Sequence, residues 1–178
     1  MKYRLERKKW QELKRERPEQ IDDTNIDQES VWNYPRPPRV EVVSETIRVD
    51  FNGLVIANSN RACRVIETAN PPCYYLPFED IRMEYLILGD LTSLCEGIAQ
   101  YWSIQVGEKY SPNAAWFYRK PEKGFEGIKD HLAFFAGKVD GCYVGNTPVQ
   151  PQSGDYYGGW ITPNLTGPFK GEPRSELW

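Results

Sequence analysis

His131 and Glu67 are the two residues best suited by type to move protons. His131 is the only histidine in the chain, and because an imidazole titrates near neutral pH it can serve as a general acid or base. Asp130 precedes it, but neighbouring residues on a helix do not face each other, so Asp130 is a poor partner for His131. The ordinary alternative, a histidine whose ring satisfies a nearby backbone group, is the one that the sequence favours.

Arg64 lies in a segment, residues 61–68, that reads equally well as a strand or as a helical turn. On a strand it shares a face with Ala62 and Ile66, and a guanidinium in apolar company must find an anion. That anion is either a ligand's carboxylate or phosphate, or a carboxylate of the protein. Glu67 would reach Arg64 directly if the segment were a helical turn. We expect Arg64 to line a pocket and to be steadied there by a protein carboxylate.

Six aromatic side chains, spread over much of the chain, are candidates for a ligand pocket. They are Tyr75, Tyr101, Trp116, Tyr118, Tyr157 and Trp160. Trp116 and Tyr118 are two residues apart, which on a strand places both on one face. Stacking on a planar ligand, or holding a cation over a ring, would use such a set. The alternative is ordinary packing in the core or at its rim, with Gly158-Gly159 making a tight turn that carries Trp160.

Metal and covalent chemistry find little support in the sequence. The four cysteines, Cys63, Cys73, Cys95 and Cys142, include no C-x-x-C pair, and structural zinc sites usually show paired ligands at short spacing. We therefore expect reduced cysteines in core positions and no metal site. The sequence also lacks the G-x-S-x-G, H-E-x-x-H and phosphate-loop patterns, so it names no cofactor.

The elements that must position these residues read as short strands. Ile47, Val49 and Phe51 alternate with polar residues, which predicts a half-buried strand, and the Asn52-Gly53 that follows is a strong hairpin signal. Further strands are expected at residues 73–76, 83–88, 99–106, 111–118 and 139–144, and a short helix at 125–132. We predict a mostly-β fold: a small antiparallel barrel or two-sheet sandwich, with an N-terminal helix and one or two short helices.

The N-terminal part differs in composition from the rest of the chain. Residues 4–17 read as a charged helix that Pro18 ends, and residues 19–30 read as an acidic linker. We therefore expect two parts, the charged helix and linker at residues 1–28 and a single mostly-β domain at residues 29–178. The helix carries few apolar residues, so we expect it to pack on the domain, on a partner protein or in a homo-oligomer.

Composition and charge exclude several classes of partner. The formal net charge is −3, whereas nucleic-acid binding needs a clustered basic face. No stretch approaches the roughly 18 apolar residues that a membrane helix needs, and the charged N-terminus is unlike a secretory signal. We expect a soluble, cytoplasmic protein with neither a nucleic-acid nor a membrane partner.

Several linked segments resemble the family called domain of unknown function 427. They include Val31-Trp32-Asn33-Tyr34-Pro35-Arg36-Pro37-Pro38 and Ala114-Ala115-Trp116-Phe117-Tyr118, with further matches at residues 56–68, 71–77, 131–140, 154–162 and 167–171. The resemblance implies a small, mainly β domain, and the family is sometimes filed under a nucleotidyltransferase-like name without an established reaction. Nucleotidyl transfer needs paired metal-binding carboxylates at short spacing; the sequence shows none, so we discount that activity. Relatives read Cys-Glu-Trp-Lys-Gly where Cys95-Glu96 runs directly into Gly97, so no role of that lysine is carried over.

The leading hypothesis is a binding module for a small polar or planar metabolite, held in a pocket lined by aromatic rings and Arg64. One alternative is an enzyme in which His131 or Glu67 transfers a proton, on a nucleotide-like substrate. Another is a protein-interaction module that works through the N-terminal helix.

Overall fold

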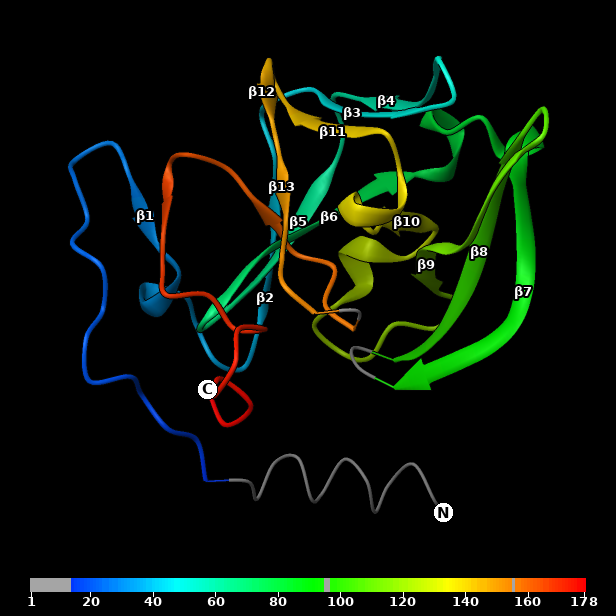
Figure 1. The fold of residues 1–178 in the computed structure, drawn as a ribbon. Coiled ribbons are helices and arrows are strands. Elements are labelled where there is room, and N and C mark those ends of the chain that lie inside the picture. Colours follow the sequence, from blue (N-terminus) through cyan, green and yellow to red (C-terminus); the bar gives the residue numbers. More distant parts are fainter. Residues whose placement is uncertain (1–13, 95–96, 155) are drawn as a thin grey trace, which may run out of the picture.

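The computed structural model describes residues 14–94, 97–154 and 156–178, which fold into short strands joined by turns (Figure 1). The strands are β1 (Glu29–Ser30), β2 (Arg39–Val42), β3 (Ile47–Phe51), β4 (Leu54–Ser59), β5 (Cys63–Glu67), β6 (Asn70–Pro77), β7 (Leu86–Leu94), β8 (Ile98–Val106), β9 (Lys109–Tyr118), β10 (His131–Phe134), β11 (Gly141–Val144), β12 (Thr147–Pro148), β13 (Gln150–Pro151), β14 (Trp160–Ile161) and β15 (Leu165–Thr166). Short 3₁₀ helices are η1 (Val31–Asn33), η2 (Phe78–Asp80), η3 (Met83–Tyr85), η4 (Glu126–Ile128) and η5 (Ala136–Lys138). The predicted mostly-β class is confirmed.

The larger sheet has seven antiparallel strands in the order β2-β5-β6-β10-β9-β8-β7. Its long strands β7 and β8 arch down one side of the molecule (green in Figure 1). The predicted alternation in β8 is confirmed, since Ile104 and Val106 are buried in the main core and Trp102 packs against it. The β8 residues that alternate with these, such as Tyr101, therefore point to the other face of the sheet, where the candidate site lies.

The smaller sheet has four strands, in the order β12-β11-β3-β4, and lies across the top of Figure 1. Ile47, Val49 and Phe51 of β3 are buried, as their alternation predicts. Asn52 and Gly53 both have positive φ, of 48° and 74°, which is the backbone that a two-residue hairpin between β3 and β4 requires. This sheet and one face of the larger sheet enclose the main core.

No sheet in the described part of the chain closes into a barrel, so the barrel alternative is wrong. The two edges of the larger sheet are β2 and β7, which do not pair with each other. The two main sheets are held together by side chains, because the main core takes buried residues from both.

The short helix predicted at residues 125–132 is wrong over most of its length. Only η4 forms within residues 125–132, and the chain then enters β10. His131–Phe134 contains three buried apolar residues in a row, which is typical of a strand covered on both faces. The predicted N-terminal helix at residues 4–17 falls mostly outside the described residues, and residues 14–17 are not helical. In the described ranges, each helix is a single 3₁₀ turn, and none is long and apolar enough to cross a membrane.

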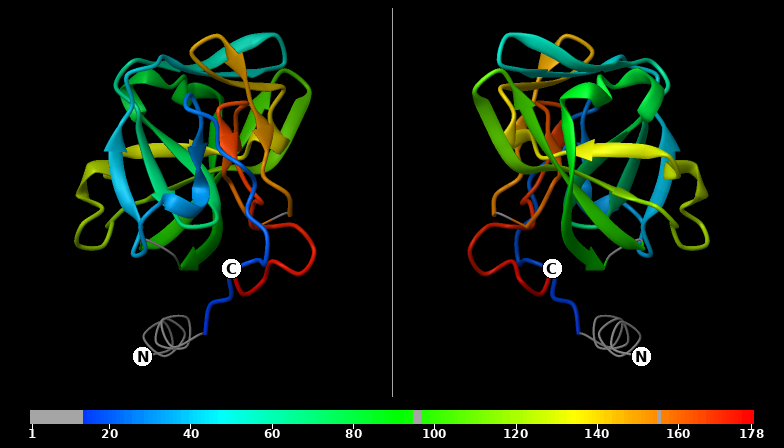
Figure 2. Two further views of the ribbon diagram at one scale, coloured as in Figure 1. Left: turned by 90° about the vertical axis from the view of Figure 1, so that its left-hand side faces the viewer. Right: turned by 90° about the vertical axis from the view of Figure 1, so that its right-hand side faces the viewer.

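Residues 14–30 and the C-terminal segment lie together at one side of the molecule (blue and red in Figure 2). β1 pairs in parallel with β15, Glu29 opposite Leu165. A separate apolar cluster joins these ends to the larger sheet through Val31, Trp32 and Ile66. The predicted linker is tied down here as well, because the Asp22 amide donates to the Gly167 carbonyl at 3.1 Å.

Candidate functional site

The face of the larger sheet that points away from the main core carries a second cluster, which we call the aromatic face. Its buried members are Val65, Tyr75, Ala99, Trp116, Tyr118, Ile128, Ala133 and Phe135, and half-buried members are Val40, Cys63, Cys73, Tyr101 and Phe125. The strand register explains the grouping. Trp116 lies between Ala133 of β10 and Tyr101 of β8, and Tyr75 lies beyond Ala133 in β6. Four of the six predicted aromatic residues therefore come together.

The rings of the aromatic face meet at varied angles. Tyr75 and Trp116 are nearly perpendicular, at 82° with centroids 6.0 Å apart, and Trp116 lies 4.4 Å from Phe135 at 45°. Tyr101 and Phe135 are nearly parallel, at 10°, with centroids 6.3 Å apart. Two hydrogen bonds fix the set, since the Trp116 indole Nε1 donates to the Tyr75 hydroxyl at 3.2 Å and the hydroxyls of Tyr101 and Ser93 lie 2.6 Å apart.

Gly158 covers the edge of Trp116. A Cβ at this position would lie 2.1 Å from Trp116 Cη2, so only glycine allows so close an approach of the backbone. The neighbouring Gly159 amide donates to Gln152 Oε1 at 3.0 Å. Gln152 is buried, and its Nε2 also donates to Asn70 Oδ1 at 3.1 Å. Gln152 thus positions the Gly158 segment, a role that no sequence pattern signalled.

Tyr157 and Trp160 take different places from the other four aromatics. Tyr157 precedes Gly158 and packs edge-on against the exposed Tyr156, with centroids 5.5 Å apart. Trp160 is fully buried in the main core. Its Nε1 donates to the Phe134 carbonyl at 2.9 Å, so Trp160 stabilises the other side of the sheet.

Arg64 also faces away from the aromatic face. It lies opposite Tyr74 in β6 and Glu41 in β2, whereas the next residue along β6, Tyr75, points to the aromatic face. Arg64 Nε donates to Glu41 Oε2 at 3.0 Å, and Nη1 donates to Glu29 Oε1 at 3.2 Å. The expected protein carboxylate is thus present twice, but the guanidinium does not line a site with the predicted aromatics.

The electrostatics of this ion cluster follow from burial and pairing. Burial alone raises the pKa of Glu41, but hydrogen bonds from Arg39 and Arg64 outweigh it and leave that pKa below its ordinary value. Burial, then the hydrogen bond to Glu29, raises the pKa of the Tyr34 phenol. Arg64 is therefore charged and satisfied by the protein, which is the behaviour of a structural arginine.

His131 and Glu67 do not share a site. His131 lies opposite Pro77, at one end of β6, and Glu67 lies opposite Asn70, at the other end. The His131 Nδ1 is 2.7 Å from the Lys129 carbonyl oxygen, as in the alternative in which the ring satisfies a backbone group. Glu67 is ion-paired with Arg36 at 3.0 Å, not with Arg64.

No disulfide joins the described cysteines. Cys63 and Cys73 are half-buried beside the aromatic face, and burial raises the pKa of the Cys63 thiol. Cys142 is buried in the main core, while Cys95 lies outside the described residues. Among the residues with described positions, no group of three or more His, Cys, Asp or Glu side chains could hold a metal ion.

Comparison with known proteins places the chain in a family. No curated protein matches the sequence. A family model described as a domain of unknown function (DUF427) matches residues 39–145, more than half of the chain. The matched range contains β2 to β11 and all the residues of the aromatic face named above, whereas Gln152 and Gly158 lie beyond it. The protein belongs to the DUF427 family.

Proposed function

We propose that the protein is a binding module for a small metabolite, and that the aromatic face is its binding site. The observation that supports this most strongly is the convergence of Tyr75, Tyr101, Trp116 and Tyr118 on one sheet face. Tyr101 and Phe125 are half-buried, so they mark where a ligand would reach the rings.

The proton-transfer alternative has less support from the geometry. His131 and Glu67 lie at opposite ends of β6, and Glu67 is engaged by Arg36. A general acid or base must lie within hydrogen-bonding reach of the reacting group, and the two candidates cannot serve one reacting centre together.

A metabolite screen by thermal shift would test the proposal. A ligand present at 100 times its Kd stabilises the folded state by about 2.7 kcal/mol, which is easily measured. Tyr101→Leu should abolish the shift, because it removes a half-buried ring from the aromatic face. Tyr110→Leu is the matched control, since this tyrosine is exposed near the start of β9 and lies outside the cluster.

Two outcomes would contradict the proposal. One is a screen without any hit, combined with native mass spectrometry of protein from its own source that shows no retained molecule. The other is a hit whose affinity is unchanged by Tyr101→Leu and lowered by Tyr110→Leu, because the ligand would then bind elsewhere.

A further inference from the structure

The segment that joins β9 to β10 is longer than the connection requires. β9 ends at Tyr118 and β10 begins at His131, and the two strands are antiparallel neighbours in the larger sheet. A hairpin between such strands needs about two to five residues, whereas residues 119–130 lie between them. The additional length allows the segment to leave its own hairpin and to extend over the aromatic face.

The far end of this segment touches the opposite edge of the sheet. A Cβ on Gly127 would lie 3.3 Å from Val40 Cγ1, and Val40 belongs to the edge strand β2. The strand order places β6 and β5 between β10 and β2, so at about 4.8 Å per strand the segment crosses roughly 14 Å of the sheet. Val40 is a member of the aromatic face, which the segment therefore covers on this side.

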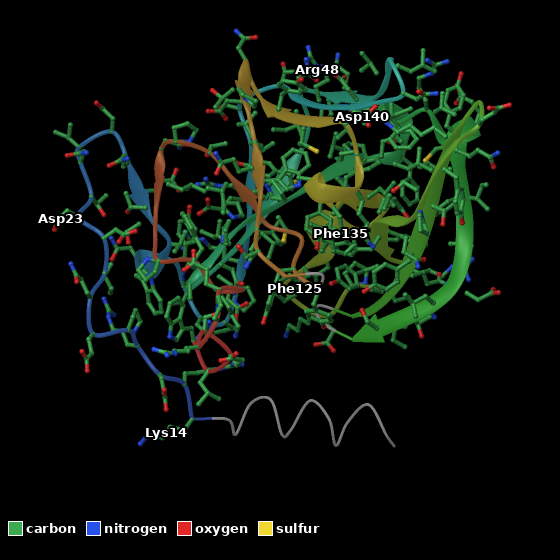
Figure 3. The ribbon with its side chains drawn as sticks, viewed as in Figure 1. Lys14, Asp23, Arg48, Phe125, Phe135 and Asp140 are labelled. Carbon is green, nitrogen blue, oxygen red and sulfur yellow. The ribbon has the colours of Figure 1, made fainter. Side chains whose placement is uncertain are left out.

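Apolar side chains hold the segment against the sheet. Ile128 is completely buried and Phe125 half-buried in the aromatic face, while the charged residues Lys123 and Glu126 between and beside them are exposed. In Figure 3, Phe125 lies below Phe135, on the side away from the smaller sheet. One side of the segment is thus apolar and faces the cluster, and the other is charged and faces solvent.

The backbone of the segment is bonded mainly to itself. In the described part of the chain, its backbone hydrogen bonds before Asp130 are donated by the amides of Phe125, Ile128 and Lys129 to carbonyls three residues earlier, at 3.0–3.1 Å. Asp130, with a positive φ of 57°, turns the chain into β10, and its carbonyl accepts from the Phe78 amide at 3.1 Å. Such a segment can leave the sheet without breaking the strand ladder, which is typical of elements that open locally.

We propose that residues 119–130 form a lid, which opens independently of the rest of the fold and controls the access of a ligand to the aromatic face. The inference rests on the proposed function and adds the regulation of the same site. With the lid closed, the rings pack against one another, as Tyr75 and Tyr118 do with centroids 6.3 Å apart. When the lid opens, Ile128 and Phe125 leave this face, and a ligand takes their place against the sheet.

A thiol placed under the lid tests whether the lid opens by itself. Val65 is buried in the aromatic face and lies opposite Val40 in the strand register, so Val65→Cys introduces a small thiol beneath the Gly127 contact. The full chain is labelled with N-ethylmaleimide, and mass spectrometry follows each cysteine separately. Cys142, buried in the main core, reports global unfolding in the same sample. We expect the introduced thiol to react at least about tenfold faster than Cys142.

Two further substitutions in this variant separate lid opening from general destabilisation. Ile128→Ser removes the main apolar anchor of the lid, and should speed the reaction of the introduced thiol by about tenfold or more relative to Cys142. Ile87→Ser is the matched control, because Ile87 is half-exposed on β7 and is not a member of the aromatic face. If the introduced thiol reacts only as fast as Cys142, or if both substitutions have the same effect, the inference is overturned.

The metabolite screen distinguishes failure of the lid from failure of the proposed function. A hit should associate faster with Ile128→Ser than with the wild type, because the lid opens more readily; an unchanged rate would contradict control of access. If the introduced thiol reacts no faster than Cys142 while a hit still depends on Tyr101, the proposed function stands and the lid is wrong. If the lid opens but the screen is empty, the proposed function fails and the role of the lid in access fails with it.

Discussion

Replacing Gly158 with alanine is the sharpest test of how the aromatic face is covered. The added Cβ would lie 2.1 Å from Trp116 Cη2 and 2.7 Å from Cζ3, well inside the usual carbon contact distance of 3.5–4.0 Å. The Trp116 indole cannot easily move away, because its ring centroid lies 4.4 Å from that of Phe135 and its Nε1 is hydrogen-bonded to the Tyr75 hydroxyl. The backbone is restrained too, through the bond from the Gly159 amide to Gln152.

The cost of Gly158→Ala should therefore be that of overpacking a filled site, about 1–3 kcal/mol. For a chain of this size the melting temperature should fall by roughly 2–4 °C per kcal/mol. Gly137→Ala is the matched control, because a Cβ there would meet nothing closer than 3.6 Å and its φ is not in the left-handed region. Thermal and urea denaturation, followed by tryptophan fluorescence, would measure both variants.

Equal stability of Gly158→Ala and the wild type would refute this reasoning. It would mean that the backbone at residue 158 does not lie on the Trp116 ring. Loss of stability in Gly137→Ala of the same size would also refute it, since the effect would then follow from replacing any glycine and not from this contact.

Two further predictions follow from single residues. Arg64→Met should cost about 1–3 kcal/mol in urea denaturation, because Glu29 loses its ion pair with Arg64 at a partly exposed site, while Glu41 keeps Arg39. Ligand affinity should be unchanged; lost affinity with unchanged stability would return Arg64 to the site. Burial lowers the pKa of Lys170 from 10.5 to about 8, so the unfolded chain binds more protons between these values and the stability contribution of Lys170 rises with pH there. Denaturation at pH 8 and pH 10.5 should show wild type gaining about 1–2 kcal/mol relative to Lys170→Met, a figure reduced for solvent screening; an unchanged difference would refute it.

The sequence predicted the elements that alternate cleanly and missed those that depend on a neighbouring strand. The buried face of β3 can be predicted from its own sequence, because the apolar residues Ile47, Val49 and Phe51 alternate with polar ones, and the prediction is correct. The face that Arg64 takes could not be read from its own strand, because both faces of β5 are partly apolar and only pairing with Glu41 and Tyr74 decides its partners.

The same limit applies to the candidate site. Trp116 and Tyr118 share a face by their spacing, and their convergence with Tyr75 needed only a sheet. The positions of Gly158 and Gln152 depend on the path of a loop, and a loop has no hydrophobic periodicity from which its path could be predicted. The predicted short helix failed at β10 because its run of apolar residues is equally suited to a helix and to a strand covered on both faces.

The parallel pairing of β1 with β15 has a consequence for how the protein assembles during synthesis. Glu29 finds Leu165 only after almost the whole chain has left the ribosome, and contacts of such long sequence separation form slowly because a large loop must close first. Until then Val31 and Ile66, both almost completely buried in the finished fold, remain without the C-terminal segment that covers them. A fragment limited to residues 39–145 would leave Ile66 exposed permanently, so we expect it to aggregate where the full chain stays dispersed.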